Sequence, residues 1–361
     1  MTIAPPPQPD HQVTRDQASH EQKEVAGLSQ GQVVRRRFRR HKGAMISVVV
    51  LLLLVILAAT SIGWGPLPGW YKWKYTDQPD LLAPKYDGSP TLAVWPFSDN
   101  FVWGIHPFGQ DETGLDLFAN VMRGTQQTLI VILVMGVIST SIGVLIGALA
   151  GYYRGWVDTV LMRFTDLILT LPVILIVAVL GRVFTVRGIW PVSLSMGFLL
   201  WVGLARLVRA EFLTLREREF VDASKVAGAS DARIIFKHIL PNSVGVIVVN
   251  TTLLLGGGIL TEAALSFLGF GIQFPDVSLG SLISQFAQSF GTRPWLFIWP
   301  GVFIIIIVLC INFIGDGLRD AFDPRQKRIP KTKDLQKGVT GDQSTDTAQS
   351  LRGATSTGVD E

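Results

Sequence analysis

Six long runs of apolar residues alternate with polar segments along this chain of 361 residues. A helix needs about 20 apolar residues to cross the hydrocarbon core of a bilayer. The runs in this chain have about that length, and they occupy residues 44–62, 126–150, 160–181, 189–205, 242–267 and 295–314. The pattern therefore predicts an all-α membrane protein with six transmembrane helices.

The polar segments divide the chain into regions of different composition. Both ends are polar and poor in aromatic residues, and such segments cannot bury enough apolar surface to fold. The segment after the first run is rich in Trp, Tyr and Pro, whereas the segment after the fourth run is charged. We expect disordered tails at 1–33 and 321–361, a basic flank with the first helix at 34–62, an outer segment at 63–124, and a five-helix core at 125–320 that contains a charged loop at 206–240.

Basic residues gather beside the apolar runs. Only 17% of the residues are charged and the formal net charge is +4, so we expect the lipid bilayer as a partner and no nucleic acid. Because lysine and arginine are retained in the cytoplasm, the cluster from Arg35 to Lys42 places the N-terminus inside. Counting six helices then places the charged loop and the C-terminus inside too.

Sequence motifs for catalysis are absent. The chain contains no G-x-x-x-x-G-K-[ST] loop that would hold nucleotide phosphates and no H-E-x-x-H motif for zinc. Cys310 is the only cysteine, so there is neither a disulfide framework nor a zinc-ligand spacing. We therefore expect no enzyme, no catalytic residue and no metal site in this chain.

The charged loop at 206–240 contains a pattern of two short helices. Phe220, Ala223 and Val226 recur at helical spacing, and Gly228 can adopt the left-handed conformation that ends a helix. The loop is therefore expected to form a compact helix-turn-helix at the membrane surface.

The second short helix has candidate start and stop signals. Ser230 or Asp231 can cap its first turn. Pro241 lacks an N–H and biases the preceding residue away from helical geometry, so the helix is expected to end there. His238 is expected to form a hydrogen bond at a helix end, in preference to sensing pH or binding a metal.

Two groups of glycines lie within the apolar runs. Gly143, Gly147 and Gly151 recur every four residues and so share one helix face, which can pack against another helix of the chain or against a partner subunit. Gly256 and Gly257, with the glycine after them, mark either a broken helix on a substrate path or a flexible packing point.

Three ionisable residues lie in or near the runs, where charge is costly. Arg163 and Asp166 are three residues apart, so we expect them to form a structural ion pair. Glu262 could contact the amine of a substrate on a translocation path, or it could form hydrogen bonds at a helix end.

The stretch EFVDASKVAGASDARIIFKHILPN resembles the EAA loop of ABC importer permeases. That loop has the pattern E-A-A, three residues, Gly, and later a hydrophobic-x-Leu-Pro ending. Residues 222–224 occupy the triplet as Asp-Ala-Ser, Gly228 follows at the family's spacing, and residues 238–241 form the ending. A literal Glu-Ala-Ala begins at Glu262, but its next glycine is one residue too far and it lies inside an apolar run.

More of the chain resembles the C-type permease subunit of dipeptide and oligopeptide importers. The stretch HPFGQDETGLDLFANVMRG is similar to that branch's HPFGTD-x-x-GRD segment, with Gln110 and Leu115 in place of Thr and Arg. The stretches GYYRGWVDTVLMRFTDLILTLP, EAALSFLGFGIQFPDVSLGSLI and GDGLRDAFDPR also match, and together the matches cover residues 36–328.

The resemblance implies a subunit of an ATP-driven peptide importer in the bacterial inner membrane. Its partners would be a homologous B-type permease, two cytoplasmic ATPase subunits or domains, and an extracytoplasmic peptide-binding protein. ATP and magnesium would be bound by the ATPases, and this chain would hold no cofactor. The EAA loop would dock in a groove of an ATPase as a coupling helix. The implied coupling residues are Phe220, Asp222, Ala223, Ser224, Val226, Gly228, His238 and Pro241.

Other functions fit parts of the pattern. A related ABC importer could carry nickel complexes or another small solute. A secondary transporter driven by an ion gradient would be expected to have more paired carboxylates within its helices. A membrane scaffold or receptor could use the charged loop as a docking site, and the loop could also lie on lipid headgroups.

Overall fold

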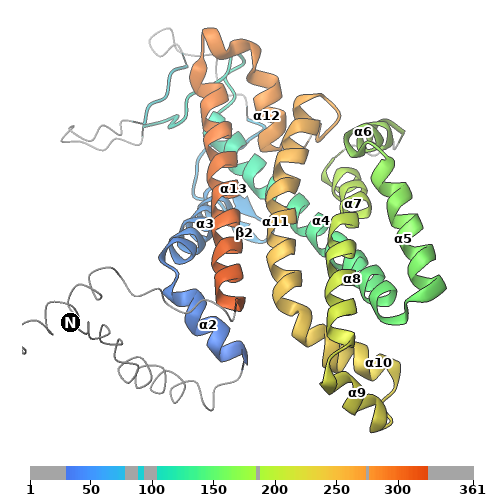
Figure 1. The fold of residues 1–361 in the computed structure, drawn as a ribbon. Coiled ribbons are helices and arrows are strands. Elements are labelled where there is room, and N and C mark those ends of the chain that lie inside the picture. The colour runs from blue at the N-terminus through green and yellow to red at the C-terminus, as the bar shows by residue number, and fades with distance from the viewer. Residues whose placement is uncertain (1–29, 78–87, 93–103, 184–187, 274–275, 324–361) are drawn as a thin grey trace, which may run out of the picture. The chain divides into compact units, whose positions relative to one another are not determined.

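The computed structural model describes residues 30–77, 88–92, 104–183, 188–273 and 276–323 (Figure 1). Helices make up most of these residues, and one short antiparallel hairpin pairs β1 (Gly63–Trp64) with β2 (Leu67–Pro68). The predicted tails lie largely outside the described residues. The helices are α2 (Gln30–Arg40), α3 (Lys42–Ser61), α4 (Leu117–Tyr153), α5 (Gly155–Thr170), α6 (Val173–Val183), α7 (Ile189–Leu199), α8 (Val202–Arg216), α9 (Glu219–Val226), α10 (Asp231–Arg233), α11 (Leu240–Phe267), α12 (Leu279–Phe286) and α13 (Pro294–Phe322), with a π-helix at Ile234–Ile239 and a 3-10 helix at Gln288–Gly291.

The described residues contain five helices long and apolar enough to cross a membrane, or six if one bent pair counts as a span. The bent pair is α5 and α6, which meet at 79°. The third predicted helix is therefore not straight. Leu171 precedes Pro172 and is extended, with φ −77° and ψ 130°, because a residue before proline is driven out of the helical region.

The second span begins earlier than its apolar run. α4 starts at Leu117 because the Asp116 carboxylate caps it, accepting from Ala119 N at 2.7 Å. Polar residues in its first turns conceal the helix in a hydropathy pattern, yet they are buried and bonded. Gln126 Nε2, for example, donates to Ala58 O at 2.6 Å. The predicted outer segment, 63–124, therefore includes the first turns of α4.

Two other predicted boundaries are wrong. The fourth span continues through α8 to Arg216, so part of the predicted charged loop is helical. The helix before Pro241 does not end there, because the π-helix leads directly into α11. Leu240 N donates to Ile235 O in the widened turn, and Asn242 Nδ2 donates to His238 O at 2.6 Å. These bonds satisfy backbone groups near a proline that has no N–H to donate.

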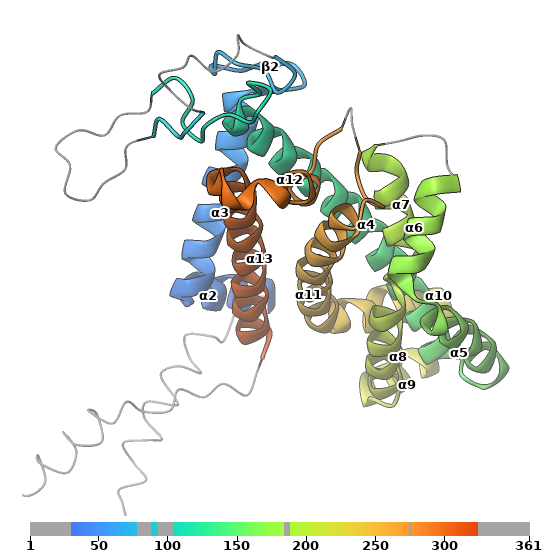
Figure 2. The same cartoon turned by 90° about the horizontal axis from the view of Figure 1, so that it is seen from above.

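α4 and α11 lie at the centre of the helix packing. α3 and α13 lie on one side of α11 and α5 to α8 on the other (Figures 1 and 2). α4 packs along α7 and α8, and α11 packs along α13. One large hydrophobic cluster joins α3, α4, α7, α11, α12 and α13. A second cluster lies at the α9 end of the bundle and contains Ala148, Tyr152, Leu204, Val208, Phe212, Val221, Ile234, Ile235 and Ile239.

Candidate functional site

α9 is the first of the two short helices predicted in the charged loop, and a left-handed glycine ends it. Gly228 has a φ of 77°. Its N–H donates to Lys225 O at 2.9 Å, while Ala229 N donates to Ser224 O at 3.0 Å. This pair of bonds is a Schellman motif. A methyl group built on Gly228 would meet no atom within 4 Å, so the backbone conformation requires glycine here. The predicted left-handed turn is confirmed.

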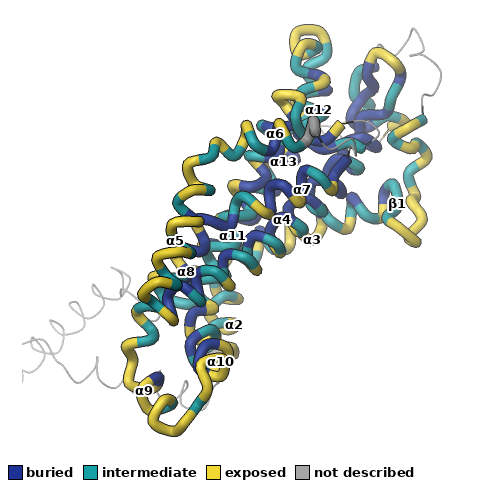
Figure 3. Tube along the Cα trace, turned by 90° about the vertical axis from the view of Figure 1, so that its right-hand side faces the viewer, coloured by how far each residue is buried: buried dark blue, intermediate teal, exposed yellow. Residues whose placement is uncertain are grey.

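α9 has one buried side chain and several exposed apolar ones. Val221 is fully buried, whereas Val226 is 90% exposed and Phe220 is 38% exposed. Figure 3 shows that most of α9 and the turn after it are exposed. Exposed apolar side chains at a loop tip favour contact with another protein. Among the predicted coupling residues, Phe220, Asp222, Ala223, Val226, Gly228 and Pro241 are exposed, and Ser224 and His238 are half-buried.

The polar members of this set form local contacts. Asp222 pairs with Lys225 at 3.1 Å, and Ser224 Oγ donates to Phe220 O at 2.7 Å. The hydrogen bond expected of His238 is not formed by its imidazole, which has no hydrogen-bond partner within the described part of the chain. Only its main-chain carbonyl is used, as the acceptor for Asn242.

The second hydrophobic cluster holds α9 on the ends of α4 and α8. Val221 of α9 lies in this cluster with Phe212 of α8 and with Ile234 and Ile239 of the π-helix, and all four are at least 99% buried. The burial of Val221 was not predicted, although its position opposite the exposed Ala223 and Val226 is a helical-periodicity signal. α9 therefore has a packed base, formed by Val221 in the second hydrophobic cluster, and an exposed ridge that includes Phe220 and Val226.

A buried tyrosine links the second short helix to α4. Tyr152 donates through its hydroxyl to Asp231 Oδ1 at 2.7 Å. Arg216 Nη1 donates to the Tyr152 carbonyl at 2.5 Å, and its guanidinium lies 5.5 Å from the centroid of the Tyr152 ring. Ser230 is the N-cap residue of α10, but its side chain forms no capping hydrogen bond. Asp231, the other predicted cap, bonds to α4 instead.

Arginines also connect α8 with the α4–α5 turn. Arg209 binds the Asp158 carboxylate through Nε at 2.5 Å and through Nη2 at 2.6 Å. Such two-point contact is the stronger form of an arginine–carboxylate pair. Arg154 pairs with Glu217 at 2.5 Å. These ion pairs thus join α8 to the α4–α5 turn and to the start of α5, whereas apolar packing joins α8 to α9.

The predicted pair between Arg163 and Asp166 is wrong. Asp166 pairs with Arg206 of α8 at 2.5 Å, and no ion pair among the described residues joins it to Arg163. Arg163 is exposed. The prediction considered only neighbours on the same helix, whereas the carboxylate of Asp166 pairs with Arg206 of α8.

The three glycines of α4 form the predicted face, and α8 of the same chain covers it. A methyl group on Gly147 would lie 2.5 Å from Ala205 O, and one on Gly151 would lie 2.7 Å from Arg209 O. On Gly143 it would lie 3.1 Å from Trp201 O. The packing alternative within the chain is therefore confirmed. The glycines allow the backbones of α4 and α8 to approach each other closely.

The glycines of α11 do not break the helix, because α11 runs without interruption from Leu240 to Phe267. A methyl group on Gly256 would lie 2.8 Å from Asn312 Oδ1 of α13, which identifies a close packing point. Gly257 has no atom within 4 Å of such a methyl group and is exposed. A role for this surface in a translocation path stays a prediction.

Glu262 lies near the end of α11 and is 1% exposed. Ser266 Oγ donates to its Oε1 at 2.7 Å, and Ser278 Oγ donates to Ser266 Oγ at 3.3 Å. The serine from the cap of α12 is thereby connected to α11. This geometry agrees with the alternative in which Glu262 forms hydrogen bonds at a helix end. Contact with a substrate amine stays a prediction.

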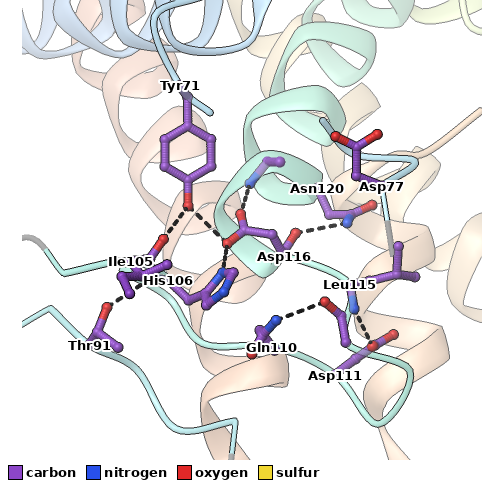
Figure 4. A network of polar contacts seen from close by, with 12 residues as sticks. Tyr71, Asp77, Thr91, Ile105, His106, Gln110, Asp111, Leu115, Asp116 and Asn120 are labelled. Atoms are coloured by element: carbon purple, nitrogen blue, oxygen red, sulfur yellow. Dashed lines mark hydrogen bonds and ion pairs between the residues drawn. The ribbon is translucent and has the colours of Figure 1, made fainter. Parts of the chain in front are cut away.

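The start of α4 contains a polar network from the outer segment (Figure 4). The capping residue Asp116 also accepts from Tyr71 Oη at 2.8 Å and lies 2.7 Å from His106 Nδ1. Burial and the neighbouring carboxylate raise the pKa of the Tyr71 hydroxyl well above its ordinary value. Tyr71 and His106, far apart in sequence, therefore meet at one fully buried side chain.

The turn before α4 explains how the motif tolerates its two unusual residues. Asp111 Oδ1 accepts from Thr113 N at 2.8 Å and from Leu115 N at 2.9 Å. Leu115 thus contributes its main chain to the turn. Gln110 adds a side-chain bond, from Nε2 to Gly114 O at 2.9 Å (Figure 4). Within the described residues, no group of three His, Cys, Asp or Glu side chains could hold a metal.

Comparison with known proteins identifies the family. The model of the binding-protein-dependent transport system inner membrane component matches residues 143–328. The N-terminal transmembrane domain of oligopeptide transport permease C matches residues 29–84. A solved MetNI methionine ABC transporter, described as inward facing, is 22% identical with a TM-score of 0.48, over 56% of this chain and 96% of that one.

Several relatives are named oligopeptide transport system permease protein OppC, and two of them illustrate the match. The one from Haemophilus influenzae is 36% identical over 307 residues, which cover 85% of this chain and 92% of the relative. The one from Mycobacterium tuberculosis is 39% identical over 225 residues, which cover 62% of this chain and 77% of the relative. These matches do not fit the alternative of a transporter driven by an ion gradient. The chain belongs to the family of binding-protein-dependent transport system inner membrane components.

Proposed function

We propose that this chain is a transmembrane subunit of an ATP-driven importer of oligopeptides, and that α9 is the helix on which a cytoplasmic ATPase acts. The family match supports the importer, and the names of the OppC relatives support the peptide substrate. The observation that carries the coupling role is the exposed ridge of α9, with Val226 at its tip and Val221 packed beneath it.

The proposal requires partners. A homologous permease would complete the translocation path, an extracytoplasmic binding protein would deliver the peptide, and two ATPase subunits or domains would bind ATP and magnesium. This chain has no phosphate-binding loop, so the ATP must be hydrolysed by those partners. The protein would lie in the bacterial inner membrane with both termini in the cytoplasm, as the basic residues beside its helices favour.

The contacts of α9 give a route for the movement. An ATPase that displaces α9 also displaces the cluster around Val221, because a close-packed interior transmits strain. The Tyr152–Asp231 hydrogen bond then carries the movement to the end of α4. The Arg209–Asp158 pair carries it from α8 to α5. The helices that border the path would therefore move together with α9, and the peptide would gain access from the opposite side.

Uptake in reconstituted vesicles tests this function. The chain is purified together with the proteins encoded beside its gene and placed in proteoliposomes that contain the binding protein. Labelled peptides of graded length are then offered with ATP inside the vesicles. We expect uptake that needs ATP and persists when an ionophore removes all ion gradients. Uptake that requires an ion gradient and does not depend on ATP would overturn the proposal. Uptake of a small solute, with no uptake of any labelled peptide, would overturn the proposed peptide substrate.

A further inference from the structure

α2 is a short basic helix placed directly before the first span. His41 separates α2 from α3; its backbone is extended, with φ −80° and ψ 98°, and its Nδ1 accepts from Ala44 N at 3.0 Å. α3 has 20 residues and is therefore about 30 Å long, which is the thickness of the hydrocarbon core. The residues beside Lys42 must then lie among the lipid headgroups.

Packing against α13 holds α2 at that depth. A methyl group on Gly317 would lie 3.3 Å from Phe38 of α2 and would clash with Ala44 in the first turn of α3. His41 Nε2 also lies 3.5 Å from Asp320 Oδ2. Phe38 and Ala44 thus meet the same point of α13, so the second half of α2 lies level with the entry of α3 into the membrane. Figure 1 shows α2 beside the end of α13.

The two faces of α2 differ in chemistry. Val33, Val34 and Phe38 are half-buried and lie within a 140° arc of the helix, as expected at about 100° per residue. The other side is basic and exposed. Its cations at Arg35, Arg39 and Arg40, with Lys42 at the start of α3, form no ion pair with any residue in the described ranges.

We infer that this basic face binds the phosphate groups of anionic phospholipids. A guanidinium group presents a planar set of donors that matches phosphate oxygens, and these cations lie at headgroup depth without a protein carboxylate. Each basic residue near a negatively charged membrane surface strengthens binding about fivefold. The inference goes beyond the transport function, because it concerns the lipid that surrounds the subunit and not the transported peptide.

The acidic residues of the N-terminal segment are the other candidate partner. Asp10, Asp16, Glu21 and Glu24 lie in residues 1–29, outside the described ranges. If they neutralised α2, anionic lipid would have little to bind. The experiment below therefore includes a variant in which these four carboxylates are replaced by their amides.

Lipid selectivity can be measured on the full-length chain in vesicles. Proteoliposomes of phosphatidylcholine carry a trace of spin-labelled phosphatidylglycerol or spin-labelled phosphatidylcholine, and the immobilised fraction of each label gives the selectivity ratio. The test variant is R35Q/R39Q/R40Q. The matched control, R35K/R39K/R40K, keeps the charge and the length of the helix. Glutamine and lysine are both good helix formers, so α2 should remain helical in both variants.

We expect the wild type to prefer phosphatidylglycerol and the glutamine variant to lose that preference by at least the roughly fivefold effect of a single basic residue, and by more if the three arginines act together. The lysine control should retain most of it, and 1 M NaCl should abolish it by screening. Equal selectivity in the wild type and the glutamine variant would overturn the inference. A preference that appears only when the four N-terminal carboxylates are amidated would overturn it too, because the intact chain would then satisfy its own cations.

Discussion

Two valines of α9 allow the base of the helix to be separated from its exposed tip. Val221 is fully buried in the second hydrophobic cluster, and Val226 is 90% exposed. Val221→Ala removes two methyl groups from packed surroundings, which costs about 1.6 kcal/mol of transfer free energy plus a cavity contribution, or about 2 kcal/mol in all. Val226→Ala makes the same chemical change on the same helix at almost no cost to the fold.

Hydrogen exchange measured by mass spectrometry reports the difference. A local cost of about 2 kcal/mol raises the opening constant of α9 roughly 30-fold, so its amides should exchange up to that much faster in Val221→Ala. The Val226→Ala exchange rates should match those of the wild type. In the assembled transporter, we expect Val221→Ala to reduce peptide uptake while the ATPase subunits still hydrolyse ATP. We expect Val226→Ala to bind the ATPase more weakly. Identical amide exchange rates in the two variants would refute the packing of Val221 in the second hydrophobic cluster.

Three further predictions concern contacts elsewhere in the fold. Tyr152→Phe removes the hydroxyl that bonds to Asp231 and should reduce the peptide uptake per ATP hydrolysed, at a stability cost of about 1 kcal/mol. An unchanged ratio of peptide uptake to ATP hydrolysis would show that this hydrogen bond does not transmit the movement of α9 to α4. Gly147→Val should lower the thermal unfolding temperature of the detergent-solubilised chain because its side chain collides with α8, whereas Gly257→Val should not; equal temperatures would contradict the close helix contact. Asp116→Ala removes the cap of α4 and two side-chain partners, and should destabilise the outer segment by about 3 kcal/mol, as measured by limited proteolysis of that segment.

Features that depend on neighbouring residues could be predicted from the sequence. The left-handed Gly228 follows from a helix end within a few residues, and the glycine face of α4 follows from a four-residue repeat. The apolar runs also located the spans, because hydropathy over about 20 residues is set by the bilayer. In each case the determining chemistry lies within one element.

Features that depend on distant residues could not be predicted in this way. Asp166 pairs with Arg206, 40 residues away, and Tyr152 bonds to Asp231, 79 residues away. Only the packing of α4 against α8 brings these groups together. The bend after Leu171 had a signal in the following proline, but average hydropathy conceals it. The helix continues through Pro241 because a π-helix precedes the proline. Its backbone groups are satisfied by a main-chain bond from Leu240 to Ile235 and a side-chain bond from Asn242 to His238, which the sequence does not reveal.

Photocrosslinking at the tip of α9 tests the central claim most directly. Val226 is replaced by benzoylphenylalanine in the assembled transporter, and the matched control places the same group at Ile46, which is 63% exposed on α3 and predicted to face lipid. On irradiation, the Val226 position should yield a covalent product with the mass of this chain plus one ATPase subunit, and the Ile46 position should not. An absence of that product at Val226, or an equal yield at Ile46, would contradict docking of α9 on the ATPase.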